Sequence, residues 1–131
     1  MAAKTTTPRE PIVSVVDDDV SVARSMERLL RLAGLRAKAF TSAEEFLRSG
    51  CAAETSCLIL DMRMPGMDGL ELQRRLRESA DWFPIIFLSA RASEEEEWQA
   101  LLSGAASFLR KPISKEALLR TIITAVKKPR I

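Results

Sequence analysis

The sequence predicts an α/β domain in which a doubly wound parallel sheet carries helices on both faces. Three observations predict it. Five short apolar runs alternate with stretches whose apolar residues recur at three- and four-residue intervals. The chain has 131 residues, the size of one domain, and can bury a full core without a metal or a disulfide. Its 47% hydrophobic and 29% charged residues are typical of a globular protein.

Strands are expected at the five apolar runs, which are residues 12–16, 35–40, 57–60, 85–88 and 106–109. Each run is short and is followed by turn-forming or helix-capping residues, which favours a strand. Strands that alternate with helices form right-handed crossovers, and the parallel sheet that results binds ligands outside the carboxyl ends of its strands. Functional residues are therefore expected at that edge of the sheet.

The stretches between the strands carry the signals of helices. One face of the first helix is expected to consist of Val22, Met26, Leu29, Leu30 and Ala33. Gly34 and Gly104 end the first and fourth helices, and Ser114 opens the fifth. The spacing of a capping box occurs at Ser42 with Glu45, at Asp68 with Glu71 and at Ser93 with Glu96.

Composition excludes several classes of protein. A net charge of +2, with acids and bases mixed along the chain, indicates neither a nucleic acid nor a membrane as partner. No apolar run approaches the ~20 residues of a membrane span, and residues 1–10 lack the apolar centre of a signal peptide, so a cytoplasmic protein is expected. Cys51 and Cys57 lack metal-site spacing and are expected to be free thiols. Residues 1–10 are interpreted as a disordered tail, 11–127 as the domain, and 128–131 as the start of a linker or a trimmed end.

Polar side chains follow four of the five expected strands. Asp17 and Asp18 follow the first, Asp61 the third, Ser89 the fourth and Lys111 the fifth. Carboxylates disfavour the ionisation of their neighbours, so three of them in one pocket need a cation. Two or three carboxylates with waters and a phosphate suit Mg²⁺. A lysine and a hydroxyl can hold phosphoryl oxygens, and the whole set therefore indicates a phosphoryl-transfer site.

Each of these residues has a simpler explanation when it is taken alone. Acidic residues after strands are usually solvated turns or helix caps, and Asp19 is expected to cap the first helix. A turn explains Asp61, a helix cap explains Ser89, and surface exposure explains Lys111. Their coincidence at the same end of four strands favours a common site.

Four segments carry a family resemblance. The four segments are VVDDD at residues 15–19, LDMRMPGMDG at 60–69, LSA at 88–90 and RKP at 110–112. They resemble the signatures of response-regulator receiver domains. The resemblance covers about residues 11–127. It implies a flavodoxin-like sheet of order 2-1-3-4-5 and a phosphorelay protein that accepts a phosphoryl group from a histidine kinase. It also implies a switch that catalyses only its own phosphorylation and dephosphorylation, and is otherwise no enzyme.

The resemblance also implies roles for individual residues. Asp61 is expected to be the phosphorylated residue and, with Asp18, a direct ligand of Mg²⁺. Asp17 is expected to act partly through water, and the backbone carbonyl of Arg63 completes the ligand set. Lys111 and Ser89 are expected to hold the phosphoryl oxygens.

Two departures concern the residues that are expected to move on activation. Ser89 stands where receivers more often carry Thr, and Phe108 stands where many carry Tyr. The resemblance further implies a cis bond between Lys111 and Pro112.

The face expected to switch comprises the fourth helix, fifth strand and fifth helix. A homodimer that forms on phosphorylation is expected to use it, with Leu101 inside the core and Leu102 near the surface, flanked by Arg110 and Lys115. The sequence of residues 60–65 resembles the corresponding motif of receivers that precede a helix-turn-helix output domain. A DNA-binding domain beyond residue 131 is therefore expected, and no nucleic-acid contact by the present chain.

Two other functions compete. A small Mg²⁺-dependent phosphohydrolase of the haloacid-dehalogenase type would use Asp17 as its nucleophile, but would leave residues 61–69 unexplained. A pseudo-receiver that acts without phosphorylation would have lost the acids or the lysine, which are all present here.

Overall fold

The computed structural model describes residues 11–127, and the expected tail and linker at 1–10 and 128–131 lie outside the described residues. The strands are β1 Ile12–Val16, β2 Arg36–Phe40, β3 Thr55–Leu60, β4 Ile85–Ser89 and β5 Ser107–Arg110. The helices are α1 Val20–Leu32, α2 Ala43–Ser49, α3 Gly69–Arg77, α4 Glu94–Leu102 and α5 Lys115–Lys127. All five expected strands form, with small shifts at their ends, and a 3₁₀ helix at Cys51–Glu54 is an addition that the sequence pattern did not predict.

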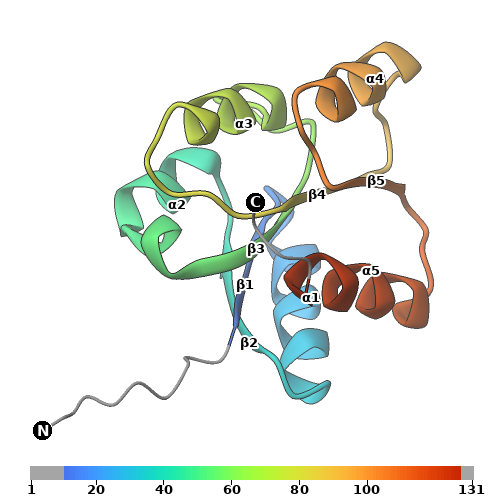
Figure 1. Cartoon of the computed structure of the whole chain (residues 1–131). Coiled ribbons are helices and arrows are strands. Elements are labelled where there is room, and N and C mark those ends of the chain that lie inside the picture. The colour runs from blue at the N-terminus through green and yellow to red at the C-terminus, as the bar shows by residue number, and fades with distance from the viewer. Residues whose placement is uncertain (1–10, 128–131) are drawn as a thin grey trace, which may run out of the picture.

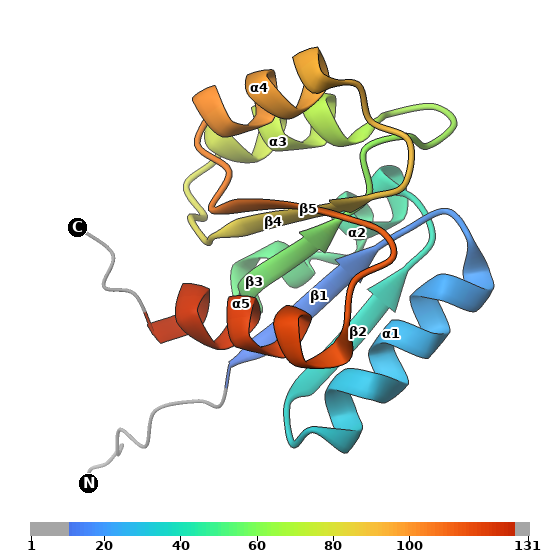
Figure 2. The same cartoon turned by 90° about the vertical axis from the view of Figure 1, so that its right-hand side faces the viewer.

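The strands form one parallel sheet in the order β2-β1-β3-β4-β5, which confirms the expected fold. Helices α1 and α5 cover one face, and α2, α3 and α4 cover the other (Figures 1 and 2). Strands β1, β3 and β4 lie inside the sheet, so nearly all of their residues are buried whichever face they point to. This double coverage explains why these strands have continuous apolar sequences.

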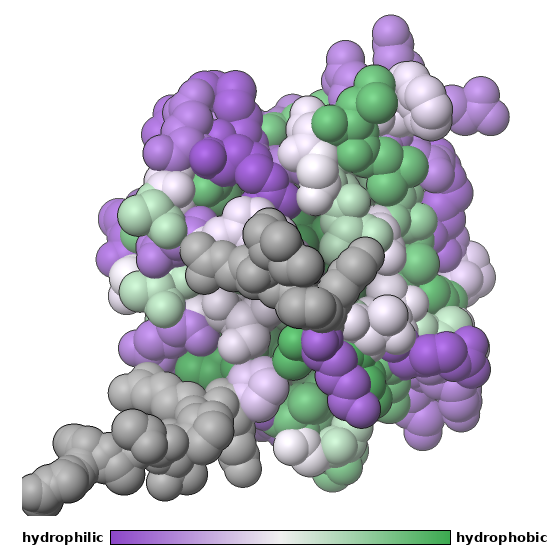
Figure 3. Space-filling model, in the orientation of Figure 1, coloured by the Kyte–Doolittle hydropathy of each residue, from purple (hydrophilic) through white to green (hydrophobic). Residues whose placement is uncertain are grey.

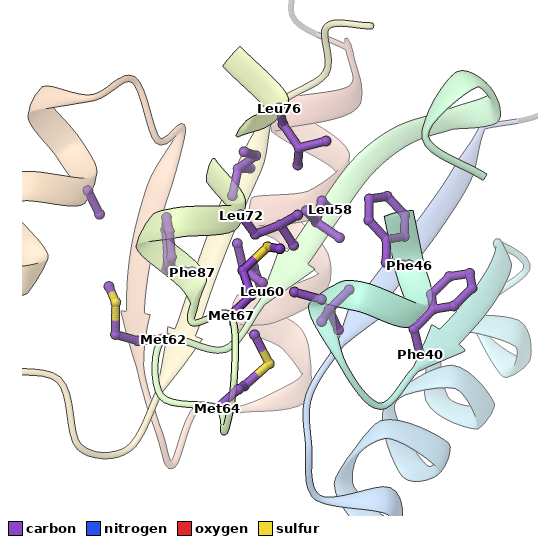
Figure 4. Packing of buried hydrophobic residues seen from close by; sticks show 14 of the residues in the cluster. Phe40, Phe46, Leu58, Leu60, Met62, Met64, Met67, Leu72, Leu76 and Phe87 are labelled. Atoms are coloured by element: carbon purple, nitrogen blue, oxygen red, sulfur yellow. The ribbon is translucent and has the colours of Figure 1, made fainter. Parts of the chain in front are cut away.

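A hydrophobic cluster lies on each face of the sheet. On one face, Leu60 and Phe87 of the sheet pack with Phe46 of α2 and Leu72 of α3 (Figure 4). The other cluster joins the alternate strand residues to α1 and α5; it includes Val15, Leu30, Ile59, Ile86, Leu118 and Ile122. The two clusters keep the strands aligned with one another along the strand direction. Their carboxyl ends therefore lie at one edge of the sheet.

The capping signals place most helix starts correctly. The Asp19 carboxylate accepts a hydrogen bond from the Val22 N–H, and Ser93 and Glu96 form the complete capping box. At α2 the box is only half formed, because the Glu45 carboxylate accepts from the Thr41 N–H and does not reach back to Ser42.

Two details of helix orientation differ from expectation. On α1, Ala33 is exposed and Ala23, outside the expected stripe, is completely buried. On α4, Ala100 is the residue that faces the core, whereas Leu101, expected inside, is 38% exposed. In both cases an alanine lets the helix backbone approach the sheet, which the apolar spacing alone does not reveal. Leu102 is 70% exposed, as expected. No helix within residues 11–127 has the length and apolar character needed to span a membrane.

Candidate functional site

Four strands deliver polar side chains to one edge of the sheet. Asp17 follows β1, Asp61 follows β3, Ser89 ends β4 and Lys111 follows β5. The strands are parallel and nearly in register, with Val16 opposite Leu60 in the β1–β3 pair. Short apolar strands of matched length therefore place these residues at the same level of the sheet, as expected from the sequence.

Three carboxylates converge at this edge. Asp17, Asp18 and Asp61 each offer an oxygen that lies within 4.8 Å of the oxygens of the other two. Asp17 is buried, Asp61 is half-buried and Asp18 is exposed. Burial raises the pKa of the Asp61 carboxyl above its ordinary value, and the neighbouring charge of Asp17 raises it further. A divalent cation at this point would relieve that repulsion, and oxygen donors of this kind fit Mg²⁺.

Lys111 brings the compensating positive charge. Its ammonium group lies 2.9 Å from the Asp17 carboxylate, and its backbone N–H donates to the Ser89 carbonyl. The bond between Lys111 and Pro112 is cis, as expected. Lys111 thus pairs with Asp17, which lies next to Asp61. The lysine side chain is long enough to reach an oxygen of a group bound to Asp61.

The Asp61 carboxylate is held by its own backbone. Its Oδ1 accepts a hydrogen bond of 2.8 Å from the Met62 N–H, and the Asp61 N–H donates to the Val16 carbonyl on β1. Asp17 is held similarly, because its Oδ1 accepts from the Asp19 N–H at 2.9 Å. Both carboxylates are therefore oriented before any ligand binds.

Ser89 and Phe108 lie on the neighbouring strands β4 and β5. Ser89 is buried, and its hydroxyl accepts from the Arg91 N–H at 3.4 Å. The Phe108 ring is half-buried and stacks on Phe87 at a centroid distance of 5.6 Å. The Arg110 guanidinium lies 5.4 Å above the same ring and forms an ion pair with Glu97 of α4.

Two glutamates at the site were not predicted. Glu44 of α2 accepts a hydrogen bond from the Met67 N–H at 3.0 Å, which lowers the pKa of its carboxyl. Glu96 of α4 binds the Arg63 guanidinium at 2.7 Å in addition to capping its helix, and the cap hydrogen bond from Ser93 lowers its pKa. Helices α2 and α4 thus hold the β3–α3 loop from both sides. The sequence shows the charge of both residues and the cap that Glu96 forms with Ser93. It does not show their contacts with Met67 and Arg63, since these join segments far apart in the chain.

The raised pKa of Asp61 means that this carboxylate, once ionised, destabilises the folded chain when no metal is bound. A carboxyl whose pKa is higher in the folded than in the unfolded chain destabilises the fold once it is ionised. This penalty is absent below the ordinary value of 3.8 and develops as the pH rises through the folded-state pKa. We therefore expect Asp61→Asn, in chelator, to raise the free energy of unfolding at neutral pH, with the gain shrinking as the pH falls toward 3.8. Urea denaturation of both proteins across this range measures it, and equal stability at neutral pH would contradict the burial argument.

Fold and site together define a flavodoxin-like α/β domain with an acidic pocket at the carboxyl ends of its strands. Residues 13–123 match the family model described as response regulator receiver domain, and the chain belongs to this family. Phosphorylation-based switching in two-component signalling is the shared property of the family, whose members are signalling proteins.

Relatives of known name agree with this assignment. The chain is 42% identical over 119 residues to the response regulator protein TmoT of Ectopseudomonas mendocina, covering 91% of the present chain and 54% of that protein. A structure of the response regulator StyR is similar at 41% identity and a TM-score of 0.83, over 91% of this chain and 60% of that one. The structure of FixJ-N is similar at 28% identity and a TM-score of 0.85, over 95% and 99%. The chain spans about half the length of the curated relatives it matches.

Proposed function

We propose that this chain is a phosphorelay receiver in which Asp61 accepts a phosphoryl group from a histidine kinase. The observation that carries the proposal is the meeting of Asp61 with two further carboxylates and a lysine at the ends of separate strands. A half-buried carboxylate oriented by backbone hydrogen bonds is suited to act as a nucleophile. The family match supports the same reaction.

In the proposed step an oxygen of Asp61 attacks the phosphorus of a phosphohistidine. The new O–P bond forms as the N–P bond breaks, and the imidazole nitrogen leaves with the electron pair and takes up a proton. Lys111 exchanges its contact with Asp17 for a phosphoryl oxygen, and the Ser89 hydroxyl donates to another. The same residues would assist hydrolysis of the acyl phosphate, so that the chain catalyses only its own phosphorylation and dephosphorylation.

The proposed resident cation is Mg²⁺. Asp18 and Asp61 would hold it directly, Asp17 partly through water, and the Arg63 carbonyl from the adjacent loop. When bound, Mg²⁺ neutralises the charge that the carboxylates and the phosphoryl oxygens accumulate. The loop that carries Arg63 is fixed by Glu44 and Glu96, which favours a preformed ligand set.

Asp18→Asn tests this ligand set against Asp19→Asn as a matched control. Both variants lose one negative charge at adjacent positions, and Asn at position 19 can still cap α1. We expect Asp18→Asn to weaken Mg²⁺ binding by at least about tenfold, since even residues that only support metal ligands have effects of this size. Isothermal titration with Mg²⁺ measures the affinities. An equal and small loss in both variants would remove Asp18 from the site.

The proposed switch runs from Ser89 through Phe108 to the α4–β5–α5 face. Phosphorylation draws the Ser89 hydroxyl inward, and Phe108 turns to occupy the space beside it. Because Phe108 stacks beneath Arg110, and Arg110 binds Glu97, this rotation would loosen the contact between β5 and α4. Both rotamers exist beforehand, so phosphorylation shifts their populations and favours the proposed homodimer.

The proposed function also implies where in the cell the chain acts. We place the chain in the cytoplasm, where the thiols Cys51 and Cys57 would stay reduced. Burial raises the pKa of Cys57 to about 12, which keeps this thiol unreactive.

The greater length of the relatives, among them a transcriptional regulatory protein FixJ of Bradyrhizobium diazoefficiens, supports a DNA-binding output domain beyond residue 131. The present chain would itself contact no nucleic acid.

A further inference from the structure

The sheet has a free edge at β2, which stands at one end of the strand order and pairs with β1. Successive residues of a strand point their backbone groups to opposite sides of it. The Phe40 carbonyl accepts from the Asp17 N–H, just after β1, and therefore points toward β1. By the same alternation the backbone groups of Ala37 and Ala39 point to the free edge. An edge of this kind can pair with a strand of another chain.

Two residues of α1, which runs alongside β2 (Figure 2), bind backbone groups at this edge. The Arg31 guanidinium donates to the Ala37 carbonyl from Nη2 at 2.9 Å and from Nε at 3.2 Å. The Glu27 carboxylate accepts from the Ala39 N–H at 3.2 Å, and an ion pair of 3.2 Å joins Glu27 to Arg31. The two side chains thus supply the donor and the acceptor that a neighbouring strand would supply. Glu27 and Arg31 are called the edge clamp below.

A second acid extends the closure beyond the end of the strand. The Thr41 N–H donates to the Glu45 carboxylate of α2 at 2.7 Å, and the Thr41 hydroxyl donates to the same oxygen at 3.2 Å. A groove of ≈ 800 Å³ runs along this edge, and its lining includes Ala39, Thr41, Glu45 and both residues of the edge clamp. A strand added to β2 would have to enter this groove, where side chains of α1 and α2 already bind the backbone.

The exposed side chains of β2 form a further barrier. Arg36 and Lys38 are both exposed and positively charged. Antiparallel pairing that sets Ala37 of one copy opposite Ala39 of another also sets Lys38 opposite Lys38, and like charges in that position are destabilising. Hydrophobic residues gather instead over α4, near β5 at the other edge of the sheet (Figures 1 and 3). Strand β2 can therefore attract a partner through its backbone and not through its exposed side chains.

We infer that the edge clamp closes the sheet against strand addition, and that β2 without the clamp pairs with β2 of a second copy. An exposed ion pair between residues four apart on a helix contributes little stability by itself. The effect of this pair lies in the two backbone groups that it satisfies and withholds from another strand. A dimer through β2 would form irrespective of phosphorylation, and only this consequence, that closure leaves association to the switch, rests on the proposed function.

Hydrogen exchange of the Ala39 amide, followed by NMR at low protein concentration, tests the clamp directly. Glu27→Ala removes the acceptor of this amide, and we expect its exchange to accelerate by at least about tenfold, as for an amide that opens locally. Glu27→Gln keeps an oxygen that can accept, so this variant should retain the protection. An Ala39 amide that exchanges equally fast in the unaltered chain and in Glu27→Ala would overturn the inference.

Sedimentation velocity of the double variant Glu27→Ala, Arg31→Ala tests what the open edge does. The mass should rise above the 14.6 kDa of the monomer as the protein concentration increases, and more steeply at high salt, which screens Lys38. The double variant Glu71→Ala, Arg75→Ala is the matched control. It removes an ion pair of the same spacing, 3.1 Å long, on α3 at the other face of the sheet, and should stay monomeric.

The position of the new contact is tested in the same samples. In the associated double variant the Ala39 amide should regain protection, because the second strand replaces the lost acceptor. A folded double variant that stays monomeric, associates no more than the α3 control, or associates with Ala39 still unprotected overturns the inference. Circular dichroism verifies folding, and if the double variant unfolds, Ala39 exchange in the single Glu27 variants decides.

Labelling of Asp61 with acetyl phosphate keeps this test apart from the proposed function. The edge clamp is no part of the proposed phosphorylation site, so both double variants should be labelled like the unaltered chain. A chain that is never labelled, but associates when the clamp is removed, rejects the function and keeps the closure. A labelled chain whose open edge does not associate does the reverse.

Discussion

Asp61→Asn should gain no phosphoryl group from acetyl phosphate and Mg²⁺, whereas the unaltered chain should gain one. The amide keeps the shape of the side chain and can still accept from the Met62 N–H, but it lacks the anionic oxygen that attacks phosphorus. Intact mass spectrometry measures the gain, and lability to base and hydroxylamine identifies an acyl phosphate.

Asp68→Asn is the matched control for this experiment. Asp68 also lies in the segment after β3, but it caps α3, a role that Asn can fill, so labelling should persist. Equal labelling of Asp61→Asn and the unaltered chain would contradict the assignment of Asp61 as the nucleophile. An acyl phosphate on Asp17 would favour the phosphohydrolase, and an unlabelled but folded wild-type chain would favour the pseudo-receiver.

Gly69→Ala should both destabilise the chain and slow phosphorylation. A β-carbon at position 69 would lie 2.5 Å from the Asp61 backbone oxygen and 3.0 Å from the Phe87 ring. Neither the end of β3 nor a buried ring can yield freely, so we expect a loss of about 1–3 kcal/mol in the free energy of unfolding. The displaced Asp61 carbonyl would also disturb the carboxylate, and acetyl-phosphate labelling should slow.

Gly50→Ala separates the two effects of this substitution. Gly50 has a φ of +77°, and a β-carbon there would have no atom within 4 Å. This variant should therefore lose roughly 1–2 kcal/mol through backbone strain alone and keep its labelling rate. Urea denaturation and labelling time courses give both quantities. A Gly69→Ala protein with wild-type stability and labelling would show that the crowding at Asp61 is absent.

The sequence by itself determined the sheet, its helices and the position of the candidate site. Apolar runs of strand length and helix caps are local signals, and each is contained in a few neighbouring residues. Parallel strands of matched length bring their carboxyl ends together, so the sequence alone places Asp17, Asp61 and Lys111 in one group. The assignment of Asp61 as phosphoacceptor needed the family resemblance in addition, because the residues alone indicate phosphoryl transfer in general.

Only the tertiary structure decided which arc of each helix faces the sheet and which distant residues support the site. Ala23 and Ala100 are buried because the backbone approaches closely at those positions, a consequence of packing that hydrophobic spacing does not encode. The contacts of Glu44 with Met67 and of Glu96 with Arg63 join residues 23 and 33 positions apart. These contacts depend on how α2 and α4 pack on the common sheet, since groups so far apart in the chain meet only once the layers have assembled.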